Sequence, residues 1–198
     1  ALVFGTPEEA RRAIRRIGAR HAGVTGVATD GRPYEARDPR LLLWVETTLI
    51  LTSLRLYDLV RGPLGARERE AYWAEWRPVA AALGIPDDVL PRTLAGLEAF
   101  EREMLATEVL PDETSRELAA AVRRPSRLIP APLLWPLDAL TAAFLPPTVR
   151  VQFGLEWRTR ERLLFRAVIV AVRALRRTLP DRLAIVPQAR RYEDRVAR

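Results

Sequence analysis

His21 is the single histidine of this 198-residue chain, and cysteine is absent. Ala10, Ile14, Ile17 and His21 follow at spacings of four, three and four residues, so they share one helix face. A structural zinc site normally takes four histidine or cysteine ligands, which this chain lacks. A haem iron needs only one proximal protein ligand, and an inward-facing histidine can provide it. Two other interpretations stay open: a buried neutral histidine with one hydrogen bond, and a histidine that interacts with a helix C-terminal dipole.

A second candidate is Glu46, which lies in the middle of an apolar run over residues 41–51 (LLLWVETTLIL). A carboxylate buried there must be ion-paired, hydrogen-bonded or protonated, because burying a bare charge is costly. Two roles are open: an ion pair with an arginine of a neighbouring helix, or a residue that faces a cofactor or substrate cavity. The hydroxyls of Thr47 and Thr48 either reach a bound ligand or return to carbonyl groups of their own helix.

Other common chemistries find no support in the sequence. There is no phosphate-binding glycine loop, no dinucleotide fingerprint and no nucleophile elbow. A di-iron bundle needs two Glu-x-x-His pairs, which one histidine cannot supply. The carboxylates Glu46, Glu68 and Glu75 match no metal-binding motif at their spacing. A second strong iron ligand would have to be Met104 or a tyrosine, which disfavours a two-ligand electron-transfer site.

The composition favours one globular core. The chain is 48% hydrophobic and is long enough for one core but short for two. The absence of cysteine excludes a disulfide framework and fits a reducing compartment, so we expect a cytoplasmic protein, with membrane association as the alternative. No signal peptide is visible, and because the chain begins at Ala1 without methionine, we expect a further N-terminal segment upstream.

The net charge of +7 does not by itself indicate nucleic-acid binding. All 32 basic residues are arginine, and lysine and asparagine are absent, which is typical of high-GC codon usage. The arginines are spread along the chain and interleaved with acidic residues, as in residues 67–75, whereas a nucleic-acid-binding protein concentrates them on one face. We therefore expect no nucleic-acid partner.

The helix signals predict an all-α, single-domain orthogonal bundle of about seven or eight helices over residues 1–198. Residues 6–9 (TPEE) form a capping box that begins a helix ending near His21, and residues 22–38 form a turn-rich excursion with room for a short hairpin. Asp38-Pro39 begins the apolar helix, which is apolar nearly all round and is expected at the centre, surrounded by others. Further helices are predicted over about residues 67–83, 93–105, 113–122, 137–144 and 159–179.

Two segments near the C-terminus have a less regular pattern. The apolar stretch over residues 128–147 contains five prolines, which forbids one continuous membrane helix and leaves a short helix between rigid turns. The last long helix is predicted to pack through Leu163, Leu164, Val168, Ile169, Val172 and Leu175. The arginine-rich tail over residues 189–198 is expected to be helical or frayed.

Several short motifs occur in a fixed order along roughly the whole chain. They are residues 4–6 (FGT), 16–26 (RIGARHAGVTG), 30–39 (DGRPYEARDP), 43–45 (LWV), 72–76 (YWAEW), 83–86 (LGIP), 90–91 (LP), 145–147 (LPP) and 154–157 (GLEW). This ordered set resembles the catalytic domain of the rubber oxygenase family. That family includes latex-clearing proteins, a membrane-bound oxygenase of mycophenolic acid biosynthesis and many proteins of high-GC bacteria.

The resemblance implies an all-helical fold that binds haem b and cleaves carbon–carbon double bonds of isoprenoids with dioxygen. It also implies that His21, in the His-x-x-x-x-Gly string, is the proximal iron ligand. Two departures separate this chain from the family pattern. The arginine and threonine that support catalysis in rubber oxygenases lie upstream of the ligand histidine and outside this chain. In addition, Glu46 stands where many relatives carry a histidine directly after Trp-Val.

The leading hypothesis is a haem-dependent oxygenase that acts with dioxygen on a small apolar substrate, isoprenoid or lipid-like. Its expected catalytic residues are Glu46 and Thr47, its expected cofactor-binding residues are His21, Trp44 and Ile17, and His21 is the expected metal ligand. A second hypothesis is a haem protein for sensing, storage or electron transfer. A third is a haem-free, non-catalytic helical protein that acts as an interaction or peripheral-membrane module through its arginine-bearing last helix.

Overall fold

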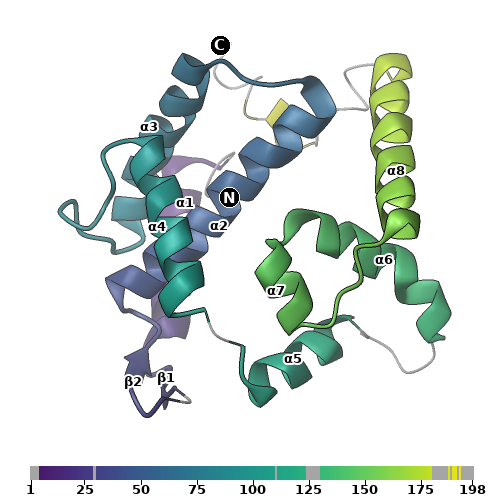
Figure 1. Cartoon of the computed structure of the whole chain (residues 1–198). Coiled ribbons are helices and arrows are strands. Elements are labelled where there is room, and N and C mark those ends of the chain that lie inside the picture. The colour runs from purple at the N-terminus through teal and green to yellow at the C-terminus, as the bar shows by residue number, and fades with distance from the viewer. Residues whose placement is uncertain are drawn as a thin grey trace. The chain divides into compact units, whose positions relative to one another are not determined.

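The computed structural model describes residues 5–28, 30–109, 111–123, 130–179, 187, 189, 190 and 192, and only the backbone at residues 131–133. The chain divides into two compact units, Ala1–Ala106 with Thr178–Arg198, and Thr107–Arg177. Within the described ranges there are eight helices and one two-stranded sheet (Figure 1), which confirms the predicted all-α fold. The prediction that residues 1–198 form a single domain stays a prediction.

The first unit begins with a capped helix and a hairpin. Its elements are α1 (Pro7–His21), β1 (Thr25–Val27), β2 (Pro33–Glu35), α2 (Pro39–Arg61), α3 (Ala66–Ala82) and all but the last residue of α4 (Leu94–Thr107). The predicted capping box of α1 is confirmed, because Thr6 and Glu9 each accept a hydrogen bond from the other's backbone N–H. The predicted hairpin is confirmed as well, with Thr25 opposite Glu35 in an antiparallel pair.

Helix α2 passes through the core of the first unit. Its buried residues are Leu43, Glu46, Thr47, Ile50, Leu51 and Leu54. Because they recur at spacings of three and four, they lie on one side of the helix. On the other side Val45, Leu49 and Leu56 remain 55%, 54% and 46% exposed. The helix is therefore central but covered on one side, whereas its run of apolar residues predicts cover nearly all round.

Helices α3 and α4 complete this core and hold each other in place. The Trp73 side chain is fully buried, and its indole N–H donates to the carbonyl of Pro91 at 3.0 Å. The Glu70 carboxylate of α3 accepts a hydrogen bond from the Leu94 N–H at 3.0 Å, so α3 caps the beginning of α4. Met104 of α4 is 1% exposed and belongs to this core.

Ion pairs fix α4 against α2. Arg40 Nη2 lies 2.6 Å from Glu103 Oε1, and Arg55 Nη2 lies 2.7 Å from Glu101 Oε2. Since the two arginines lie about four turns apart on α2 while the two glutamates lie half a turn apart, α4 crosses α2 between them.

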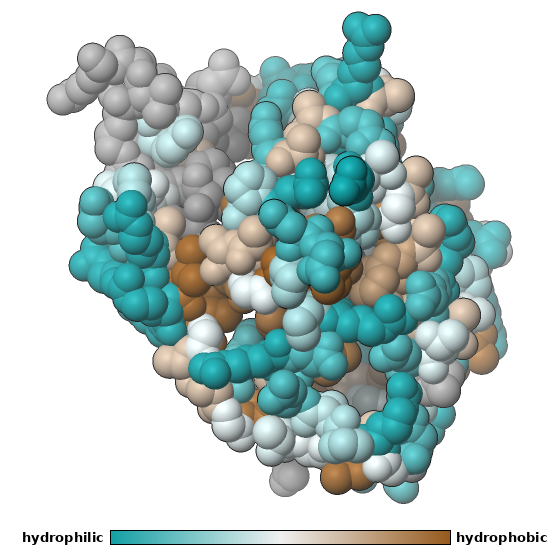
Figure 2. All heavy atoms as spheres, turned by 90° about the vertical axis from the view of Figure 1, so that its left-hand side faces the viewer, coloured by the Kyte–Doolittle hydropathy of each residue, from teal (hydrophilic) through white to brown (hydrophobic). Residues whose placement is uncertain are grey.

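The surface of the face drawn in Figure 2 is mostly hydrophilic. Apolar side chains show there only in patches between polar and charged ones. This distribution follows from a composition with 29% charged residues, most of which stay in water. No helix within the described ranges has the length and apolar character that a membrane crossing requires.

The second unit contains α5 (Glu113–Arg123), α6 (Ala131–Phe144), α7 (Pro147–Gln152) and all but the last residue of α8 (Thr159–Thr178). Helix α6 begins six residues earlier than predicted. Pro132 lies in its first turn, where a helix needs no backbone N–H, although Pro136 inside the helix removes one hydrogen bond. Pro147 begins α7 in the same way, and the sequence pattern does not predict this helix.

The predicted packing side of α8 is only partly correct. Leu164, Val168 and Ile169 are half-buried. In contrast, Leu163, Val172 and Leu175 are 58%, 39% and 56% exposed. The predicted helical or frayed tail over residues 189–198 lies mostly outside the described residues.

A buried carboxylate joins α6 to the beginning of α8. Glu161 is 2% exposed, and its Oε1 accepts hydrogen bonds from Trp135 Nε1 at 2.9 Å and Arg160 Nε at 3.0 Å. Its Oε2 accepts a third from the backbone N–H of Arg158 at 2.9 Å. These bonds, that of Trp135 above all, lower the pKa of Glu161 from 4.5 to about 2.

The stability of the second unit should therefore fall in acid through Glu161. Because its pKa is lower in the folded than in the unfolded chain, the carboxylate stabilises the fold above pH 4.5 and loses this effect as the pH falls towards about 2. Glu161→Gln should lower the thermal unfolding midpoint at pH 7 and make little difference near pH 2, measured by circular dichroism. Glu156→Gln, at an exposed carboxylate, is the matched control. An equal loss at both pH values would contradict the role of the charge.

Candidate functional site

His21 ends α1 with a half-buried side chain. Ala10, Ile14 and Ile17 on the same face are also half-buried, and α1 has no fully buried residue. Among the described residues, no hydrogen bond or ion pair involves the imidazole. The alternative of a histidine satisfied by one hydrogen bond is thus not seen in this part of the chain. Both ring nitrogens are available to a ligand.

The end of α1 is tied to the beginning of α2. Arg37 Nη2, two residues before α2, donates a hydrogen bond to the Gly18 carbonyl in the last turn of α1 at 3.1 Å. The Ala36 N–H also donates to the Val24 carbonyl at 2.9 Å. These bonds keep His21 at the corner of the first unit where α1, the hairpin and α2 meet.

Glu46 is the unusual residue of α2. It is 7% exposed, and within the described ranges its Oε2 meets no hydrogen-bond donor. Burial raises its pKa above 4.5. The ion pair with an arginine of a neighbouring helix, considered from the sequence, is not seen among the described residues. Buried polar atoms without partners are rare and call for an explanation.

The neighbouring threonines already use their protons. Thr47 is fully buried, and its Oγ1 donates to the Leu43 carbonyl at 2.7 Å. Thr48 Oγ1 donates to the Val45 carbonyl at 2.8 Å. Both threonine hydroxyls therefore donate to carbonyl groups of their own helix, which was one of the two open interpretations. The Thr47 oxygen can still accept a hydrogen bond, and the half-buried Trp44 lies one turn before it.

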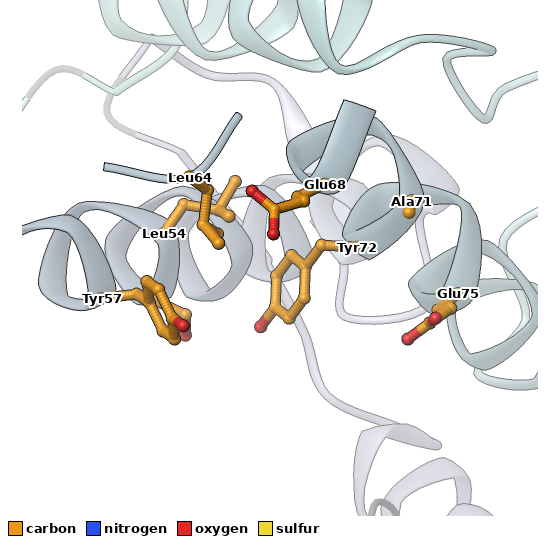
Figure 3. Close-up of a pocket in the computed structure, with 8 residues that line it drawn as sticks. Leu54, Tyr57, Leu64, Glu68, Ala71, Tyr72 and Glu75 are labelled. Carbon is orange, nitrogen blue, oxygen red and sulfur yellow. The ribbon is translucent and has the colours of Figure 1, made fainter. Parts of the chain in front are cut away.

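A cavity of about 440 Å³ lies between α2 and α3 (Figure 3). It is lined by Ser53, Leu54, Tyr57, Leu64, Glu68, Ala71, Tyr72 and Glu75. None of the site residues expected from the sequence belongs to this lining. A signal for it is nevertheless present, since residues 68, 72 and 75 of α3 recur at helical spacing and share one face.

Clusters of metal-ligating side chains do not occur in the described part of the chain. No three residues among histidine, cysteine, aspartate and glutamate come together there in a way that holds a metal ion. Glu46, Glu68 and Glu75, whose spacing matches no metal-binding motif, do not form such a cluster within the described ranges. A cofactor that needs a single protein ligand remains compatible with it.

The first unit is thus a mainly helical scaffold that offers one histidine nitrogen ligand and, among the described residues, the unpaired buried carboxyl of Glu46. The sequence model of the family described as "ER-bound oxygenase mpaB/B'/Rubber oxygenase, catalytic domain" matches residues 1–174, and the chain belongs to this family. The match confirms the resemblance drawn from the short motifs, and it runs over both compact units.

Two curated relatives agree with the extent of this match. The chain is 25% identical over 186 residues to an uncharacterized protein of Mycobacterium tuberculosis and equally to one of Mycobacterium bovis. Each alignment covers 88% of this chain and 70% of the relative. No solved structure matches the chain.

Proposed function

We propose that this chain is the catalytic domain of a haem-dependent oxygenase that acts on an apolar, isoprenoid or lipid-like substrate. Membership of an oxygenase family supports the class of reaction. The observation that carries the site is the unpaired carboxyl of Glu46 on the buried face of α2. Leaving such a group without a partner is costly, and perturbed buried carboxyls are typical of functional sites.

The residues of the first unit fit a haem held by His21. The imidazole makes no hydrogen bond among the described residues, and the α1 face around it is apolar and only half covered. Ile17 and Trp44 would form apolar walls for the cofactor, as expected from the sequence. The chemistry that haem b supplies when bound is the activation of dioxygen.

Glu46 is proposed to hold or move a proton beside the substrate. Its raised pKa keeps the carboxyl protonated at a higher pH than an exposed glutamate, so Oε2 can give a proton and take it back. Thr47 is proposed to accept a hydrogen bond there, since its own hydroxyl proton is donated to the Leu43 carbonyl. The buried Leu43 and Ile50 on the same side of α2 would exclude water from this region.

Cleavage of one double bond by one dioxygen molecule, as the resemblance implies, places each oxygen atom in one of two new carbonyl groups. No external reductant is then required. We expect the haem-loaded chain to consume oxygen with squalene, in a ratio of about one dioxygen per double bond cleaved, and to consume none with squalane. Squalane is the matched control because it has the same carbon skeleton without double bonds. Oxygen-electrode traces and carbonyl detection measure both, and equal uptake with the two hydrocarbons would contradict the proposal.

A haem-free peripheral-membrane module is the second candidate, and one observation favours it. Leu163 and Val170 of α8 are 58% and 64% exposed, and at seven residues apart they share one side of the helix with Arg166. Apolar and basic side chains on one helix side are typical of helices that lie on anionic membranes. Failure of the chain to bind haem, together with binding to anionic vesicles, would favour this candidate over the oxygenase.

A further inference from the structure

The charged side chains that line the cavity between α2 and α3 are all acidic. Among the described residues, Glu68 and Glu75 are its only charged side chains and no arginine lines it, although the whole chain carries a net charge of +7. The nearby Arg69 is engaged elsewhere, since its Nη1 lies 2.7 Å from Asp58 Oδ2. Both carboxylates would therefore repel an anionic ligand in this cavity.

The two carboxylates are available to a ligand. Glu68 Oε2 accepts a hydrogen bond from the Gly65 N–H at 2.7 Å, which fixes the side chain and leaves its other oxygen free of protein donors in the described ranges. Glu75 forms no ion pair with any described residue. In Figure 3 the Glu68 carboxyl lies between Leu64 and the Tyr72 ring, and Glu75 lies at the far end of the cavity.

Aromatic rings form the remaining recognition surface. Tyr57 comes from α2 and Tyr72 from α3, and Figure 3 shows both phenol rings directed to the same side of the cavity. The Tyr72 ring is held by an edge contact with Trp76, at 6.2 Å between centroids. The face of such a ring attracts a cation, most strongly where neighbouring apolar groups exclude water. Leu54, which is 1% exposed, provides that apolar floor.

We propose that this cavity binds a small organic ammonium ion with apolar substituents. Its volume of about 440 Å³ lies within the range of small-molecule sites. Glu68 and Glu75 are exposed carboxylates, which attract a cation and offer nothing to a neutral apolar ligand, so the cation is the better match. This inference does not depend on haem or on oxygenation, because none of the expected oxygenase residues lines the cavity.

The test compares choline with 3,3-dimethylbutan-1-ol, which has the same shape but carbon in place of the charged nitrogen. Chemical-shift titrations of the full chain should give at least about tenfold tighter binding of choline. Raising the salt concentration should weaken choline binding and leave the neutral alcohol unaffected. Equal affinity for the two compounds, or no saturable binding of choline, would overturn the proposal.

Variants of the lining locate the binding. Glu75→Gln and Glu68→Gln should each weaken choline about three- to tenfold, and the glutamine at position 68 keeps an acceptor for the Gly65 N–H. Glu8→Gln removes the same charge from an exposed residue of α1 outside the lining, so choline affinity should not change. Tyr72→Phe should retain binding and Tyr72→Leu should lose it. Unchanged affinity in both glutamine variants would show that choline binds elsewhere.

Discussion

Replacing Glu46 by leucine is expected to stabilise the chain and to abolish oxygenation at the same time. The carboxyl is 7% exposed and its Oε2 has no donor among the described residues, so the fold gains when this group is removed. A gain of about 1–3 kcal/mol in the free energy of unfolding is expected from the cost of a buried unsatisfied polar group. A rate loss of about a hundredfold or more is expected if Glu46 transfers a proton.

The pH dependence of stability distinguishes the charge of Glu46 from a change in packing, because a packing effect does not vary with pH. Burial raises the pKa of Glu46 above the 4.5 of the unfolded chain, so its contribution to stability is fully present below pH 4.5 and is lost as the pH rises through the folded pKa. The advantage of Glu46→Gln over the wild type should therefore grow between pH 4.5 and 8. Glu161 has the opposite sign, because its pKa is lowered.

Urea unfolding at pH 4.5 and pH 8, followed by circular dichroism, measures the stability gain of Glu46→Leu and the pH dependence of Glu46→Gln. Thr47→Val is a useful neighbour control, since it removes the hydroxyl that donates to Leu43 but no titratable group. A Glu46→Leu variant that is less stable than the wild type at both pH values would mean that the carboxyl has a structural partner, and the proton-transfer role would then lack its basis.

The sequence was sufficient for the helices whose beginnings carry strong local signals. The capping box at Thr6 and Glu9 and the Asp38 cap of α2 depend on residues within one turn, so they can be read from neighbouring letters. Prolines were harder to interpret, because a proline can either end a helix or occupy its first turn. Pro132 and Pro147 lie in the first turns of α6 and α7. The first turn of a helix tolerates proline, and local sequence does not say which role applies.

The sequence was sufficient to name candidate residues of the site but not to predict which groups they contact. The sequence places Glu46 on a buried face, but whether an arginine of a neighbouring helix reaches it depends on how the helices pack, and none does among the described residues. The cavity between α2 and α3 combines side chains of two helices, and only the tertiary packing of these helices brings them together. Its α3 half has helical spacing, but that spacing alone does not distinguish a cavity wall from a solvated face.

Loss of His21 should remove haem binding altogether. No other histidine or cysteine exists in the chain, and Met104 is 1% exposed inside the core of the first unit, where it packs among apolar residues. The His21 side chain makes no hydrogen bond with a described residue, so His21→Ala should leave the fold intact. Free imidazole should restore haem binding to the variant by filling the space of the missing ring.

The most direct measurement is an absorption titration of the full chain with haem, beside His21→Ala with and without imidazole. We expect a Soret band that saturates at about one haem per wild-type chain, disappears in the variant and returns with imidazole. Circular dichroism of the two proteins checks that the fold is retained. Identical Soret bands in the wild type and the variant, or no saturable band in either, would contradict the assignment of His21 as the ligand of a haem oxygenase.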